Sequence, residues 1–262
     1  LILAAVLTSV ALLVDNAIAS SMPSGSVAAL GLGSKLTLFM TGILGTGMAA
    51  VITPYFSSFM ARKHLLGARQ ELSFLMAFVT VVLVPISLAI HLSAPHLIEF
   101  VFGKGLPDNG NLDNIILIMR LGILQLPFFT CNMLLVKFAT AHKKTRIITC
   151  AAAFGLTCNI VLDFILVKFL SVAGIALATS MSMLVSAGVL LIYAHYTGHI
   201  SWFDLFSTLL SWALYLTLIV CISFKSYSGI VVVTGAYLIL LVKQIRILLI
   251  SESMLPVSEH AA

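Results

Sequence analysis

Charged residues are scarce in this sequence. Of its 262 residues only 9% are Asp, Glu, Lys or Arg, whereas 61% are hydrophobic, and the mean hydropathy is +1.16. A soluble globular domain has about 25% charged residues. So few charges cannot cover the surface of a water-soluble enzyme, and the composition also excludes disordered chains and disulfide scaffolds. The scarcity of charge therefore indicates a protein surrounded by lipid.

The sequence also lacks the patterns of metal, nucleic-acid and catalytic sites. Its four cysteines are Cys131, Cys150, Cys158 and Cys221. They stand in apolar stretches without metal-ligand spacing, so we expect small buried side chains, no metal and no cofactor. The basic residues are dispersed between apolar runs, which does not fit a nucleic-acid surface. No H-E-x-x-H motif or Ser/His/Asp set is present, so the sequence predicts no catalytic centre.

Eight long apolar runs make up most of the chain. They cover approximately residues 1–21, 26–58, 70–93, 112–139, 146–169, 172–196, 203–224 and 228–250. Because a transmembrane helix needs about 20 apolar residues and barrel strands are shorter and alternating, these runs predict an all-α polytopic membrane protein with about eight transmembrane helices. The stretch 94–102 is too short to span, and we expect it to lie at the membrane interface.

The second run is too long for a straight span. Its 33 or so residues would reach roughly 50 Å as a helix, against a hydrocarbon core of about 30 Å. We expect it to tilt, protrude or bend, and the residues that allow a bend are Gly42, Gly45, Gly47 and Pro54.

Lysine and arginine in the connections predict the orientation. One set of connections, together with the C-terminal end, carries Arg62, Lys63, Arg69, Lys143, Lys144, Arg146, Lys243 and Arg246. The opposite set carries only Lys104, Lys168 and Lys225. Because cytoplasmic loops are enriched in basic residues, the first set and both chain ends are expected in the cytoplasm. The connection near His195 and His199 has no Lys or Arg and gives no support to either orientation.

Ionisable residues inside the apolar runs are the candidate functional residues, because a charge at membrane depth is costly. Lys35 lies about 13 Å below the outer turn by helical rise, so it either faces a water-filled cavity or snorkels to the surface. Asp15 lies at a comparable depth on the preceding run, which makes an Asp15–Lys35 ion pair geometrically possible. Asn159 and Asp163 share one helical face; they either line a cavity or coordinate a cation, or form a hydrogen bond between helices.

Several of these residues belong to segments that resemble the MviN/MurJ family of lipid II flippases, within the MOP exporter superfamily. The segments are 14–20 (VDNAIAS), 24–27 (SGSV), 35–36, 42–45 (GILG) to Pro54, 100–105 (FVFGKG), 137–139, 143–145 (KKT), 159–163 and 173–179 (AGIALAT). They cover about residues 1–196, whereas the last two runs match by hydrophobicity alone. One departure is the pair Arg146-Ile147, where the family usually has a proline.

The resemblance implies a fold, a substrate and a binding residue. Family members have fourteen helices, so residues 1–196 would be the second six-helix lobe with its first helix truncated, residues 197–250 two additional C-terminal helices, and residues 251–262 a cytoplasmic tail. The chain opens at Leu1 without Met, and we expect a fragment whose partner is the missing N-terminal half. The substrate would be an undecaprenyl-diphosphate-linked peptidoglycan precursor, moved outward across the bacterial cytoplasmic membrane by alternating access.

Within this substrate cavity, the resemblance assigns the diphosphate to Lys35, at a position where the family commonly has Arg. Asp15, Asn159 and Asp163 are expected to line the cavity. The last two helices would border a groove for the lipid tail.

Three other functions stay open at this point. Another MOP-superfamily transporter, either a polysaccharide-repeat flippase or a cation-coupled drug antiporter, would have the same fold, and an antiporter would depend on Asp15 or Asp163 rather than on Lys35. A membrane-embedded transferase would need paired acidic residues in cytoplasmic loops, where the sequence offers only Glu71. A truncated, inactive gene product is the third.

Overall fold

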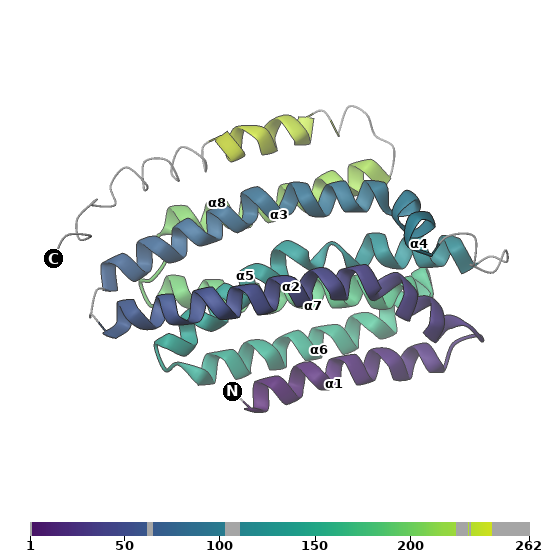
Figure 1. Ribbon diagram of the computed structural model, residues 1–262, viewed down its shortest axis with the longest axis horizontal. Helices are drawn as coiled ribbons and strands as arrows, with labels where there is room; N and C mark the ends of the chain where they lie inside the picture. The colour runs from purple at the N-terminus through teal and green to yellow at the C-terminus, as the bar shows by residue number, and fades with distance from the viewer. Residues whose placement is uncertain (1, 62–64, 103–110, 224–229, 231, 243–262) are drawn as a thin grey trace.

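The computed structural model describes residues 2–61, 65–102, 111–223, 230 and 232–242. Its labelled helices are α1 (Ile2–Ser20), α2 (Ser26–Ala61), α3 (Leu65–Phe102), α4 (Asn111–Gly122), α5 (Gln125–Ala141), α6 (Thr145–Leu170), α7 (Ala173–Tyr196) and α8 (Trp202–Ser223). Every regular element in these ranges is helical, which confirms the predicted all-α class. The helices lie side by side along one common direction (Figure 1).

Seven helical segments within the described part of the chain are long and apolar enough to cross a membrane. They are Ile2–Ser20, Ser26–Ile52, Gln70–Phe102, Leu112–Ala141, Thr145–Leu170, Ala173–Tyr196 and Trp202–Ser223. A shorter apolar helix, Val232–Val242, falls within the eighth predicted run, of which residues 228, 229, 231 and 243–250 lie outside the described ranges. The chain is therefore a multi-pass membrane protein.

The structure divides the fourth predicted span into α4 and α5, a break that we did not predict. Pro127 has no backbone N–H and its ring crowds the carbonyl four residues earlier, at Ile123, where the chain leaves the helix. The hydroxyl of Ser180, on α7, donates a hydrogen bond of 2.7 Å to the Leu121 carbonyl. A side chain from a neighbouring helix thus satisfies a backbone group near the break.

Residues 94–102, which we expect at the membrane interface, are the last turns of α3. The helix runs on through Pro85 and Pro95. Ala94 and Ile98 are buried in a cluster with residues of α1, α2 and α4. Packing of this apolar face holds the segment in the helix despite its prolines. The α2 helix is likewise continuous over 36 residues and contains Pro54.

Two glycines allow α6 and α7 to approach closely. A Cβ atom at Gly174 would lie 2.6 Å from the backbone carbonyl of Leu166, and one at Gly155 would lie 3.3 Å from the Cβ of Ser186. Small residues at such contacts are typical of helix pairs in membranes, where backbones come close enough for short polar side chains to interact. The pairing sets α6 and α7 close together along the segment that holds the candidate site.

The α8 helix is fixed to the rest of the bundle by hydrogen bonds between side chains. Tyr215 and Ser87 of α3 share a hydrogen bond of 2.8 Å, and Ser73 donates one of 2.9 Å to Asp204. The Tyr237 hydroxyl donates to the Thr80 carbonyl at 3.2 Å, which attaches the segment 232–242 to the same helix. Both C-terminal elements therefore pack on α3.

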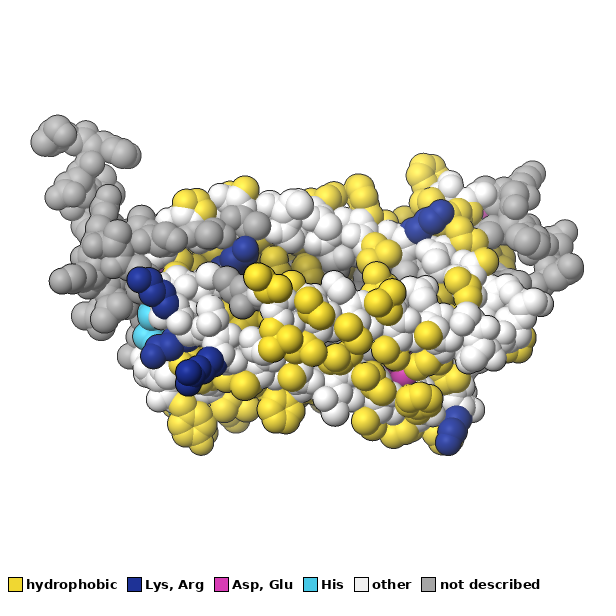
Figure 2. Space-filling view, turned by 90° about the horizontal axis from the view of Figure 1, so that it is seen from below, with side chains coloured by type: hydrophobic (Ala, Val, Ile, Leu, Met, Phe, Trp, Pro, Cys, Tyr) yellow, Lys and Arg dark blue, Asp and Glu magenta, His cyan; other side chains and the backbone are white. Residues whose placement is uncertain are grey.

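Side-chain types divide the surface as expected for a protein in a bilayer. Hydrophobic side chains cover the middle of the face shown in Figure 2, and most of its basic side chains gather at one end. That end holds the turn between α5 and α6, which contains Lys143 and Lys144. The connection 62–64 and residues 243–262, which carry other basic residues of the predicted cytoplasmic set, lie outside the described ranges.

One cysteine prediction is wrong. Cys131 is buried, but Cys150 is exposed, and Cys158 and Cys221 are half-buried. An apolar run does not tell which side of a membrane helix faces the protein, because lipid and core are equally apolar.

Candidate functional site

A cluster of polar side chains lies buried between α1, α6 and α7. Asp15 comes from α1, Asn159 and Asp163 come from successive turns of α6, and Thr179 comes from α7. Asp15 is 7% exposed, Asn159 1% and Asp163 0%. The helical spacing of four places Asn159 and Asp163 on one face, and both α1 and α7 pack against α6. Residues separated by up to 164 positions in sequence thus form one site.

Most of the polar atoms of this cluster have no hydrogen-bond partner. The Thr179 hydroxyl lies within donating distance of Asp15 Oδ2, at 3.2 Å, and of the carbonyl of Ile175, at 2.9 Å. The other Asp15 oxygen, both Asp163 oxygens and both polar atoms of the Asn159 amide are buried without a partner. Unpaired buried polar groups are rare in folded proteins and costly, so this concentration makes the cluster the candidate functional site.

The carboxyl groups of Asp15 and Asp163 lie near enough for their charges to interact, and the Asn159 amide lies beside them. Two adjacent carboxylates away from water repel each other and lose several kcal/mol of hydration each. A proton shared between them removes the repulsion, and a cation held by their oxygens also offsets part of the lost hydration. The carboxylate, amide and hydroxyl oxygens present here are the donors that a hard cation prefers.

The cluster does not have the ligands of a transition-metal site. No group of three or more His, Cys, Asp or Glu side chains with metal-binding geometry is found in the described ranges. The cluster therefore suits a proton or a hard cation with mixed oxygen ligands, and it offers no soft nitrogen or sulfur donors.

The structure does not join Asp15 to Lys35, so the ion pair considered from sequence is absent between these two described residues. Depth along a helix follows from sequence, but the direction in which a side chain points does not. Asp15 points toward α6 and α7, whereas the Lys35 ammonium lies over the ring of Phe102, 5.6 Å from its centroid. A cation over an aromatic face is weakly stabilised.

Lys35 lies on an exposed face of α2. Gly31, Leu38, Gly42 and Thr46 are exposed at the helical spacing that places them on this same face. A Cβ atom at Gly31 or Gly42 would meet nothing within 4 Å. The α2 face around Lys35 (residues 31, 35, 38, 42 and 46) is thus exposed and carries one positive charge, and the Phe102 ring lies beside its ammonium.

Sequence reasoning singled out Asp15, Asn159, Asp163 and Lys35 but not how they group. The structure brings the first three together and leaves Lys35 apart on α2. It adds Thr179, which the sequence presents only as the last residue of a small-residue segment. The available signal was the alternation of small and hydroxyl residues from Ala173 to Ser186, which is typical of a tightly packed helix with a polar side.

Comparison with known structures agrees with this architecture. A MurJ lipid II flippase in an inward closed conformation is 20% identical, with a TM-score of 0.64 over 95% of this chain and 51% of its own. A MOP superfamily transporter from Pyrococcus furiosus is 18% identical, with a TM-score of 0.66 over 95% of this chain and 61% of its own. A MATE structure in the bent conformation is 17% identical, with a TM-score of 0.65 and the same coverage.

At these identities the structures show a shared fold, and the chain spans about half to three fifths of their lengths. No curated protein sequence matches the chain. The family model described as lipid II flippase MurJ, however, matches residues 2–245, which include α1 to α8 and the candidate site. By that match the chain belongs to the MurJ lipid II flippase family.

Proposed function

We propose that a protein carrying this chain moves a lipid-linked peptidoglycan precursor, lipid II, outward across the bacterial cytoplasmic membrane. The observation that carries the proposal is the family match over residues 2–245. The lipid tail remains in hydrocarbon during such a movement, so the energetic obstacle is the charged diphosphate and its polar headgroup. The protein needs a positive site in a hydrated cavity and no covalent chemistry, so we propose a transporter rather than an enzyme.

Lys35 is the residue of this chain that we propose for the diphosphate. Its face of α2 is exposed, and the open positions at Gly31 and Gly42 leave room for a bulky headgroup beside the ammonium. The proposed division of the chain into domains agrees with this role of Lys35. Residues 1–196 would form one six-helix lobe, with α4 and α5 as a single broken span, and its α2 face would meet the other lobe of the transporter.

Residues 197–250 would add two helices for the lipid tail, and residues 251–262 would form a tail on the cytoplasmic side. Basic residues in the turn between α5 and α6 support a cytoplasmic position for that end. Both chain ends would then lie in the cytoplasm.

The Asp15–Asn159–Asp163–Thr179 cluster would serve as the site that couples transport to a cation or proton. Its occupation would neutralise the carboxyl groups and hold α1 against α6 and α7. Release would leave two unpaired buried charges and favour a different arrangement of α1. A site of this kind gives alternating access a driving force, because ligand binding shifts the balance between two conformations.

Growth of cells depleted of their own lipid II flippase tests the role of Lys35. A protein carrying this chain is expected to restore growth, Lys35→Arg to retain that ability, and Lys35→Ala to lose it. Lys168→Ala is the matched control, because it removes another exposed lysine near the same end of the bundle. Full growth with a stably inserted Lys35→Ala variant would contradict the assignment.

Unfolding in detergent tests the coupling site. Replacing a large organic cation with Na⁺ is expected to raise the unfolding midpoint of the intact protein. At a Na⁺ concentration a hundred times its dissociation constant, the rise corresponds to about 2.7 kcal/mol of added stability. Acidifying the medium is expected to raise the midpoint as well. Asp163→Asn should abolish this response. Asp113→Asn, which removes an exposed carboxylate of α4, should retain it. An equal response in both variants would rule out the cluster as the binding site.

The second candidate function is a cation-coupled antiporter of the same superfamily, and the buried carboxyl pair is the observation that favours it. The two functions separate by their dependence on Lys35. An antiporter would retain transport in Lys35→Ala and lose it in Asp15→Asn or Asp163→Asn, whereas a lipid II flippase would lose transport in Lys35→Ala.

A further inference from the structure

A cavity of about 140 Å³ opens at the end of the bundle that carries the basic turn. It lies between the C-terminal ends of α5 and α7 and the turns that follow them. Its lining is Leu135, Phe138, Ala139, His142, Lys144, Leu190, Tyr193, Ala194, Thr197 and His199. It shares no residue with the carboxylate cluster or with the α2 face around Lys35.

The two turns beside the cavity have the same backbone design. After α5 the chain turns at Lys143, whose φ is 57°, and the Lys144 amide donates to the Ala139 carbonyl at 2.9 Å. After α7 it turns at Gly198, whose φ is 75°, and the His199 amide donates to Ala194, also at 2.9 Å. Both are Schellman-type ends, in which a residue with positive φ reverses the chain. Each turn thereby places its next side chain, Lys144 or His199, at the cavity.

Aromatic contacts hold the two turns together. The Phe138 ring lies 4.2 Å from the ring of His142 and 5.1 Å from that of His199, and the two imidazoles are 4.5 Å apart, all between centroids. The Nδ1 atom of His142 pairs with the Phe138 carbonyl at 3.0 Å, and its Nε2 atom is buried with no hydrogen-bond partner. These contacts fix the wall of the cavity, so the site is formed before a ligand binds.

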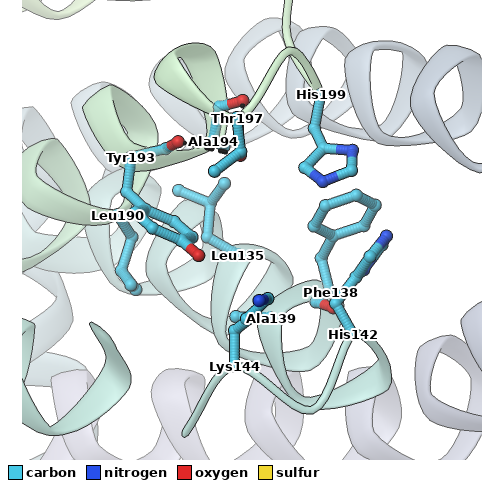
Figure 3. A pocket seen from close by; sticks show the side chains of 10 residues that line it. All are labelled: Leu135, Phe138, Ala139, His142, Lys144, Leu190, Tyr193, Ala194, Thr197 and His199. Atoms are coloured by element: carbon cyan, nitrogen blue, oxygen red, sulfur yellow. Dashed lines mark hydrogen bonds between the residues drawn. The ribbon is translucent and has the colours of Figure 1, made fainter. Parts of the chain in front are cut away.

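The charge and polarity of the lining select an anion with an apolar part. None of the ten lining residues is acidic, whereas Lys144 supplies a positive charge, Tyr193 and Thr197 supply hydroxyl groups and the two histidines supply imidazoles. In Figure 3 the Tyr193 hydroxyl and the Lys144 ammonium lie on one side of the cavity, and Phe138 and His199 border the other. Leu135 and Leu190 make its inner wall apolar.

We propose that this cavity binds the phosphate of an anionic phospholipid headgroup, with Lys144 as the charged contact and Tyr193 as a hydroxyl donor. The position supports a lipid rather than a soluble anion. The cavity lies at the ends of membrane-spanning helices, and Tyr196 and Trp202, 84% and 68% exposed, flank it in sequence as aromatic residues do at headgroup depth. Basic pockets between helices on the cytoplasmic side suit acidic headgroups.

Native mass spectrometry of the protein carrying this chain, in neutral detergent, tests the proposal. Phosphatidylglycerol is expected to bind saturably at one site and phosphatidylcholine to bind there at least tenfold more weakly. Lys144→Gln should weaken phosphatidylglycerol binding about tenfold, since it removes a charge-assisted contact to the phosphate. Lys143→Gln is the matched control, because it removes the neighbouring exposed lysine that does not line the cavity, and should change affinity less than twofold.

Other outcomes overturn the proposal. An equal loss in Lys143→Gln and Lys144→Gln would mean general attraction to the basic end, and unchanged binding in Lys144→Gln would mean a different site. Displacement of the lipid by a few millimolar inorganic phosphate would make the cavity a site for the free anion. If Lys144→Gln unfolds, Tyr193→Phe gives the same test, because it removes one hydroxyl and should weaken binding severalfold with the unfolding midpoint unchanged.

Discussion

The close contact between α6 and α7 at Gly174 makes a sharp prediction about the candidate site. In Gly174→Ala, the new Cβ atom would lie 2.6 Å from both the carbonyl carbon and oxygen of Leu166 and 2.8 Å from the Val167 nitrogen. These are backbone atoms, so no side chain can rotate away, and the two helices must separate. Forcing a carbon into a packed interior costs about 1–3 kcal/mol.

Gly188 of the same helix provides the matched control. A Cβ atom there would meet nothing within 4 Å. Alanine in a helix interior is favoured over glycine by roughly 0.5–1 kcal/mol, so Gly188→Ala should be neutral or slightly stabilising. The two variants make the same chemical change on one helix, and their stabilities are expected to differ by about 1.5–4 kcal/mol.

Reversible unfolding in mixed dodecyl maltoside and sodium dodecyl sulfate micelles measures this difference. Separation of α6 and α7 would also move Thr179, five residues beyond Gly174, away from Asp15, so the response to cation or acid should weaken in Gly174→Ala and persist in Gly188→Ala. Equal stability of the two variants would refute the close packing at Gly174. An unchanged cation response in Gly174→Ala would mean that the candidate site does not depend on that packing.

Two further predictions concern the buried polar contacts of the bundle. Ser180→Ala should lower the free energy of unfolding by about 1–3 kcal/mol in the same assay, because it leaves the Leu121 carbonyl beside the α4–α5 break without its hydroxyl donor. An unchanged midpoint would mean that water replaces the hydroxyl there. Tyr215→Phe should lower the free energy of unfolding by about 1 kcal/mol, because it removes the hydrogen bond to Ser87. Ser87→Ala should then cost less in the Tyr215→Phe background than in the intact protein. Additive losses would mean that the two hydroxyls do not interact.

Hydrophobic length predicted the helices well, because it depends only on the thickness of the membrane. The runs at 1–21, 146–169 and 172–196 correspond within a few residues to α1, α6 and α7. The break at Ile123 was missed because Pro127 lies four residues beyond it, inside a run that is apolar on both sides. The extension of α3 to Phe102 was missed because burial of Ala94 and Ile98 depends on helices elsewhere in the chain.

The sequence singled out the residues of the candidate site but not the directions in which they point. Asp15 and Lys35 are expected at similar depths, yet they point to different neighbours, and only the packing of α1 on α6 decides that Asp15 meets Asp163. The cavity at Lys144 had no sequence signal as a site. It depends on two turns that are 55 residues apart and adopt one backbone geometry, and the side chains that follow them meet only in the folded bundle.

Movement of lipid II itself is the most direct test of the proposed function. Cells depleted of their own flippase would express a protein carrying this chain, and a water-soluble enzyme that cleaves lipid II at the outer face would report how much of it has crossed. The account predicts cleavage with the intact protein and Lys35→Arg, and protection of lipid II with Lys35→Ala. Protection in all three, with the protein stably inserted, would contradict the assignment of lipid II as the substrate.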